Sequence, residues 1–131
     1  MQPVEVHHPP AGEGAHRNEV VLVGRVAAAP EERELPSGDL IAVWRLVVDR
    51  PPARRRAAAG TGQRSPTVDT LDCVAWTTGV RRKVARLEAG DVVAVHGALR
   101  RRFWRAGAAT VSRYEVEATA VQRLRKGHQQ N

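Results

Sequence analysis

The strongest constraint on the fold of this chain is the stretch from Gly90 to Gly107, which reads as a single long β-strand. Turn residues bound it at both ends, and the residues between them are rich in valine, arginine and aromatic side chains. Side chains alternate between the two faces of a strand. The apolar face is expected to hold Val93, Val95, Gly97 and Leu99. The opposite face is expected to hold Arg100, Arg102 and Trp104.

A strand face with guanidinium groups and an indole ring suits a single-stranded nucleic acid, because arginines bind phosphates and a flat ring stacks on a base. A solvated basic strand with a tryptophan packed at its end is the alternative that this stretch alone leaves open. The net charge of +7 favours a polyanionic partner, with nucleic acid ahead of an anionic membrane. Only two of the 21 basic residues are lysines. Codon bias explains much of this preference for arginine, but not the net charge.

The rest of the chain predicts more strands and one short helix. Alternation of apolar residues predicts strands at residues 18–26, 40–48, 68–76 and 109–124. The first is expected to be buried on both faces, with Gly24 marking a bulge or a close backbone approach. Residues 30–39 predict a loop and a turn. Thr77 and Thr78 cap a helix with apolar positions Val80, Val84 and Leu87, and Gly90 ends it.

Three strands, a helix and two strands is the order of an OB-fold barrel. We therefore expect an all-β fold, a five-stranded OB-fold barrel with one short helix between strands 3 and 4, over residues 18–124. A disordered N-terminal tail (residues 1–17) and a short basic tail (residues 125–131) flank it. Residues 49–67 form a long, mobile connection. Its Arg54, Arg55 and Arg56 are either solvated or, as the basic chain favours, in contact with phosphates.

Other single residues carry more specific expectations. Trp44 shares the apolar face of its strand, so we interpret it as a core residue rather than a ligand contact. Cys73 is flanked by apolar residues and is expected to pack in the core rather than act as a nucleophile. Trp76 is a second candidate for base stacking, although Asp72 shares its face and would repel phosphate. A single cysteine excludes an internal disulfide and a multi-cysteine zinc site.

Four segments resemble the bacterial single-stranded DNA-binding protein (SSB) family, and they occur in the order and at the spacing of that family. They read NEVVLVGRV from residue 18, LPSG from residue 35, LEAGD from residue 87 and HGALRRRFW from residue 96. The third and fourth carry the family's helix exit (leucine, two residues, glycine) and its strand (glycine, one residue, leucine, arginine) that ends in tryptophan. The resemblance implies an OB fold, a homotetramer, no catalysis, and single-stranded DNA wrapped over aromatic and basic surfaces.

Carried over residue by residue, the resemblance places Trp104 on a base-stacking tryptophan and Trp76 on a base-stacking phenylalanine. Thr70 stands where a stacking tryptophan is common, Asp72 replaces an arginine, and Ser112 stands where a tyrosine is usual. Losing rings weakens binding, and added arginines compensate for it with a steeper salt dependence. The family's acidic C-terminal tip is replaced by a basic end. We therefore expect a short auxiliary member that does not dock repair enzymes by that route.

The predicted function is sequence-tolerant binding of single-stranded DNA in replication, recombination or repair, by a cytoplasmic, nucleoid-associated tetramer or dimer. The predicted contacts are Trp76, Trp104, Arg45, Arg54, Arg55, Arg56, Arg100, Arg102 and Arg105. Two alternatives remain: an RNA-binding OB-fold protein, and a degenerate OB-fold subunit that binds nucleic acid weakly. No catalytic motif, metal site, cofactor site, signal peptide or membrane span is predicted.

Overall fold

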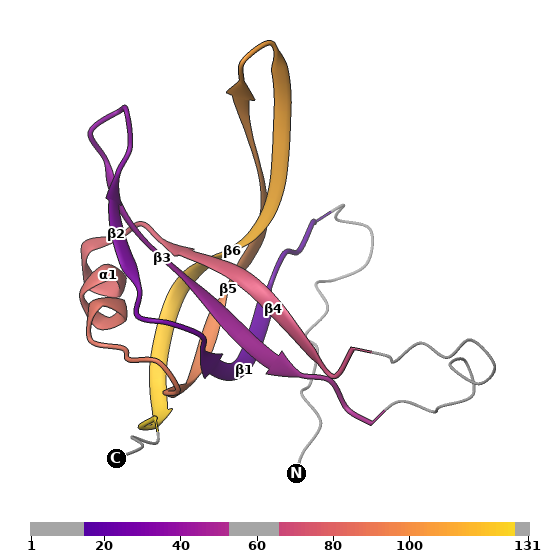
Figure 1. Ribbon diagram of the computed structural model, residues 1–131, viewed down its shortest axis with the longest axis vertical. Helices are drawn as coiled ribbons and strands as arrows, with labels where there is room; N and C mark the ends of the chain where they lie inside the picture. The colour runs from indigo at the N-terminus through magenta and orange to yellow at the C-terminus, as the bar shows by residue number, and fades with distance from the viewer. Residues whose placement is uncertain (1–14, 53–65, 128–131) are drawn as a thin grey trace, which may run out of the picture.

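The structure is a computed structural model that describes residues 15–52 and 66–127 (Figure 1). Its elements are β1 (Val20–Val26), β2 (Glu31–Glu34), β3 (Leu40–Asp49), β4 (Val68–Ala75), α1 (Thr78–Ala85), β5 (Val92–Ala106) and β6 (Ala109–Arg125). The predicted phosphate contacts Arg54, Arg55 and Arg56 lie outside the described residues. Most of the predicted N-terminal tail and the last four residues of the basic tail also lie outside them.

The strands form a closed five-stranded barrel in the order β1-β5-β6-β4-β3, with β2 added at the edge of β3. β1 closes the barrel by pairing with β3, where Arg25 lies opposite Val47 and Val26 opposite Leu46. β4 and β6 run parallel, and the other neighbours are antiparallel. The helix lies between β4 and β5. The predicted OB-fold barrel with one short helix is therefore confirmed.

The edge strand β2 was not expected, because its residues were predicted to be loop. All four of its residues are exposed charged side chains, so they show no alternation of apolar and polar residues. The strand is set instead by a hairpin with β3, whose turn places Gly38 at a φ of 93°. In Figure 1 this β2–β3 hairpin and the β5–β6 hairpin rise on the same side of the barrel.

The barrel interior is filled by small and branched side chains around one indole. Trp44 is 5% exposed and Cys73 is 2% exposed, which confirms both as core residues. Val84 of α1 and Leu87 after it are also buried against this core. The Thr77 hydroxyl accepts a hydrogen bond from the Val80 N–H, as expected of an N-cap. The helix ends at Ala85, before the predicted end at Gly90, so Leu87 packs from the following turn.

β1 is not buried on both faces as predicted. Val21 and Val23 are more than half exposed, because the barrel has a solvent side as well as a core side, and alternate residues of β1 face each. The close approach predicted at Gly24 is confirmed. A Cβ there would lie 2.4 Å from the carbonyl oxygen of Val47 on the neighbouring β3, so a larger residue has no room.

A β-bulge in β6 changes which residues reach the core. His96 lies opposite Ala120, but Gly97 lies opposite Ala118, so Thr119 is the extra residue. The buried positions therefore pass from Ala118 to Val121 instead of to Ala120, as regular alternation would have it. Leu99, which was predicted to lie in the core, is 46% exposed, because the pairing of β5 with β1 ends at Gly97 and β1 does not cover the residues beyond it.

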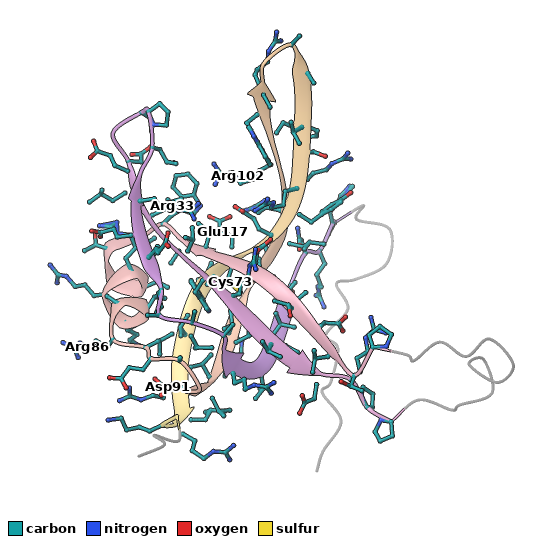
Figure 2. The ribbon with its side chains drawn as sticks, in the orientation of Figure 1. Arg33, Cys73, Arg86, Asp91, Arg102 and Glu117 are labelled. Atoms are coloured by element: carbon teal, nitrogen blue, oxygen red, sulfur yellow. The ribbon has the colours of Figure 1, made fainter. Side chains whose placement is uncertain are left out.

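A buried carboxylate, Asp91, links the turn before β5 to the end of β6. Asp91 accepts hydrogen bonds from the backbone N–H of Glu88 at 2.9 Å and of Gly127 at 2.6 Å, and from Arg123 at 3.4 Å. Burial alone raises the pKa of Asp91, but these donors outweigh it and hold the pKa below its usual value. The side chain thus ties the end of β6 to the turn before β5. Figure 2 shows Asp91 far from the hairpin that carries Arg102.

No helix within the described residues is long and apolar enough to cross a membrane. The same part of the chain contains no cluster of three histidine, cysteine, aspartate or glutamate side chains that could hold a metal ion.

Candidate nucleic-acid interface

The β5–β6 hairpin positions most of the candidate site residues. Gly107 makes its turn with a φ of 65°, and Trp104 then lies opposite Val111, Arg102 opposite Arg113 and Arg100 opposite Glu115. Residues opposite each other in an antiparallel pair share a face. We call the surface formed by Arg100, Arg102, Trp104, Arg113, Glu115 and Glu117 the ion-pair face. It continues across β4 and β3 through Asp72, which lies opposite Arg45.

Two indole rings lie on the ion-pair face, each beside a guanidinium group. Trp104 is 43% exposed, and the guanidinium carbon of Arg113 is 5.7 Å from its ring centroid. Trp76 directly follows β4 and is half-buried, with the guanidinium carbon of Arg102 5.4 Å from its ring centroid. Both distances fall in the range of cation–π contacts. Rings and cations are thus interleaved on one surface.

Carboxylates also occupy the ion-pair face and hold its arginines. The shortest pair joins Arg100 Nε to Glu117 Oε1 at 2.7 Å, and Arg102 pairs with Glu115 at 3.2 Å. Asp72 accepts from Arg45 Nε at 3.2 Å and lies 3.8 Å from a nitrogen of Arg113. The four arginines and three carboxylates leave one net positive charge. Partly exposed pairs of this kind are weak, so a phosphate group can compete for the arginines.

Arg102 and Glu117 lie on the side of the molecule where the two hairpins rise (Figure 2). Next to them is a pocket of about 360 Å³. Its lining includes Arg33 of β2, Arg45, Asp72, Arg113 and Glu115, with the core residues Trp44 and Cys73. Burial, and then the charges of Asp72 and Glu115, raise the pKa of Cys73 to about 12. The thiol therefore stays protonated at neutral pH, and the pocket has no thiolate nucleophile.

Two arginines of the β5–β6 hairpin differ from the predicted set: Arg105 lies on the other face, and Arg113 was not predicted. Arg105 is exposed, but it lies opposite Thr110, so its side chain projects from the other face of the hairpin than Trp104. Arg113 was not among the predicted contacts, although it lies beside Trp104. The signal for Arg113 was the hairpin turn, because counting outward from Ala106 and Ala109 pairs it with Arg102. Alternation within one strand does not show which strands lie side by side.

Comparison with known proteins gives the same family. The model of the single-strand binding protein family matches residues 17–124. A single-stranded DNA-binding protein from Oceanobacillus iheyensis is 33% identical over 114 residues, which cover 86% of this chain and 66% of that protein. Single-stranded DNA-binding protein A of Bacillus subtilis is 32% identical over 108 residues, covering 82% of this chain and 59% of its own length.

Single-stranded DNA-binding protein 3 of Listeria innocua is 33% identical over 85 residues, 65% of this chain and 49% of that protein. The chain thus spans about half to two thirds of the curated relatives that it matches. A solved structure, the Plasmodium falciparum SSB complex with ssDNA, superposes with a TM-score of 0.64 at 21% identity. The likeness covers 84% of this chain and 95% of that one, and it shows the shared fold. Together with the family match over residues 17–124, these findings show that the chain belongs to the single-strand binding protein family.

Proposed function

We propose that this protein binds single-stranded DNA with little sequence preference, through the ion-pair face. The observation that carries the proposal is the interleaving of Trp76 and Trp104 with Arg102 and Arg113 on one surface. A ring stacks on any base, and an arginine binds any phosphate, so neither contact reads sequence. The names of the relatives and the DNA in the superposed structure support the choice of ligand.

The mechanism that we propose begins with an exchange of ion pairs. Phosphates replace Asp72, Glu115 and Glu117 as partners of the arginines, and bases stack on the partly exposed rings. When a phosphate draws Arg102 away from Trp76, more of that half-buried ring becomes available. Each stacked base contributes about 1–3 kcal/mol, and this part of the affinity depends little on salt. Arg45 extends the phosphate track onto β3.

The wider role is proposed on the same basis. We propose that the protein coats single-stranded DNA as a non-catalytic homo-oligomer, a tetramer or a dimer, during replication, recombination or repair. Its place would be the cytoplasm, at the nucleoid. Arg54, Arg55 and Arg56 remain proposed phosphate contacts. Arg105 remains a proposed contact too, at the edge of the other hairpin face.

Quenching of tryptophan fluorescence by oligo-dT tests the function. We expect the wild-type protein to be quenched on binding and Trp104→Ala to bind about 5- to 100-fold more weakly, since one stacking ring is lost. Trp104→Phe is the matched control, because it keeps a ring on the same face. Unchanged affinity of Trp104→Ala, with an unchanged melting temperature, would contradict the proposed use of this face. Competition between dT and rU oligomers of equal length tests the DNA preference against the RNA alternative.

A further inference from the structure

The opposite face of the same hairpin carries a second cluster of rings around an arginine. Arg101 lies opposite Tyr114, and Phe103 lies opposite Ser112, so these four side chains share a face. We call them the second hairpin face. Phe103 is 61% exposed and Tyr114 is 58% exposed, the largest values for any large apolar side chain in residues 15–52 and 66–127. Large apolar side chains gathered at a surface usually mark a binding site.

The contacts within the second hairpin face hold Arg101 in a defined position. The guanidinium carbon of Arg101 lies 5.0 Å from the centroid of the Phe103 ring and 5.3 Å from that of Tyr114. The Nε and one terminal nitrogen of Arg101 donate to the Ser112 hydroxyl at 3.3 and 3.2 Å. The guanidinium group is therefore held against both rings by a neutral hydrogen-bond acceptor, while the rings keep more than half of their surface in solvent.

The charge of Arg101 distinguishes this face from the ion-pair face. Arg100 and Arg102, its neighbours in sequence, are each held by a glutamate. Within the described part of the chain, no carboxylate pairs with Arg101, whose partner is the Ser112 hydroxyl. A cation with no carboxylate partner, set between two exposed rings, matches a ligand that has both negative charges and flat rings. Single-stranded nucleic acid is the ligand class with that combination.

We propose that the second hairpin face is a second contact site for single-stranded DNA, in which bases stack on Phe103 and Tyr114 and Arg101 binds a phosphate. A strand that passes over the end of the hairpin then contacts both of its faces. The inference rests on the proposed function and adds a site to it. A second copy of the chain fits less well, because a two-fold interface would bury two Arg101 cations without partners.

The test is a titration of the full chain with dT oligomers of graded length, at one fixed salt concentration. The variant is Phe103→Leu with Tyr114→Leu, which keeps apolar bulk but removes both rings. We expect it to bind long oligomers about 10-fold or more weakly and to occlude fewer nucleotides per protomer, because stacked bases are lost. Phe103→Tyr and Tyr114→Phe are the ring-retaining comparisons, and each is expected to bind more tightly than the double leucine variant. Melting temperatures establish that every variant is folded.

Photocrosslinking locates the contact directly. Oligo-dT with 5-iododeoxyuridine is irradiated on the wild-type protein, and the linked peptides are identified by mass spectrometry. Crosslinks to Phe103 or Tyr114 are the expected result. If Trp104→Ala weakens binding while the double leucine variant binds and occludes as the wild type does, the second site is refuted and the proposed function stands. If the double variant instead changes the mass in light scattering at unchanged affinity per protomer, the face is an interface between copies, which also refutes the site. A wild-type protein that does not bind oligo-dT refutes both.

Discussion

The carboxylates of the ion-pair face offer the sharpest test of how this surface binds phosphates. Asp72, Glu115 and Glu117 hold four arginines in pairs of 2.7 to 3.8 Å, so a phosphate must displace each carboxylate before it binds. We predict that replacing the carboxylates with amides strengthens DNA binding, although each change removes contacts seen in the free protein. A reading of these pairs as purely structural predicts no gain.

The size of the effect follows from the geometry. Partly exposed pairs contribute roughly 0.2–1 kcal/mol each. Asp72 faces two arginines, so Asp72→Asn is expected to tighten binding at low salt about 2- to 30-fold. Asp72→Asn, Glu115→Gln and Glu117→Gln together raise the net charge of the face from one to four. Because each phosphate neutralised on a single strand contributes about 0.7 to the slope of log K against log salt, the slope should steepen by about 2.

The assay is the fluorescence titration with oligo-dT, repeated at several salt concentrations for each variant. Glu88→Gln is the matched control. It removes the same charge from an exposed position between Arg86 and Asp91, which Figure 2 shows far from Arg102, and it is expected to change affinity and slope little. If folded Asp72→Asn and the triple variant keep the wild-type affinity and slope, phosphates do not bind these arginines, and the mechanism proposed for this face is wrong.

Three further predictions concern the barrel. Gly97→Ala places a Cβ 1.9 Å from the carbonyl oxygen of Glu117 and should lower the free energy of unfolding by about 2–3 kcal/mol in urea, whereas Gly79→Ala, in open space, should not lower it. Asp91→Asn should lower the free energy of unfolding at pH 7 by about 1–3 kcal/mol. Folding lowers the pKa of Asp91, so the carboxylate stabilises the fold above the ordinary aspartate pKa, and this stability is lost as the pH falls through the lowered pKa of the folded state. Urea titrations from pH 7 to 3 should therefore show a smaller loss of unfolding free energy with acid in Asp91→Asn than in the wild type. Cys73, with its pKa raised to about 12, should react with a thiol reagent in urea but not in the native protein, and native reactivity at neutral pH would contradict this.

The sequence was sufficient for the elements whose side chains alternate strongly. The long strand up to Ala106, the burial of Trp44 and Cys73, and the tight backbone approach at Gly24 all follow from patterns within one segment. Alternation records which residues a strand turns toward the core, and glycine records where a neighbour leaves no room. The order of the elements then selected the OB fold, because few folds place one helix between the third and fourth strands of a small barrel.

Features that depend on pairing between distant segments could not be predicted from patterns within one segment. The bulge at Thr119 shifts the buried face of β6, and β2 forms only because a hairpin places four charged residues beside β3. Leu99 has the pattern of a core residue, yet it is exposed because β1 stops pairing with β5 at Gly97. Likewise, a single strand shows Arg100 and Arg102 on one face, but not the glutamates of β6 that pair with them. Side-chain direction is a local property of the chain, whereas the partner of each arginine depends on strand register, which is set across the whole barrel.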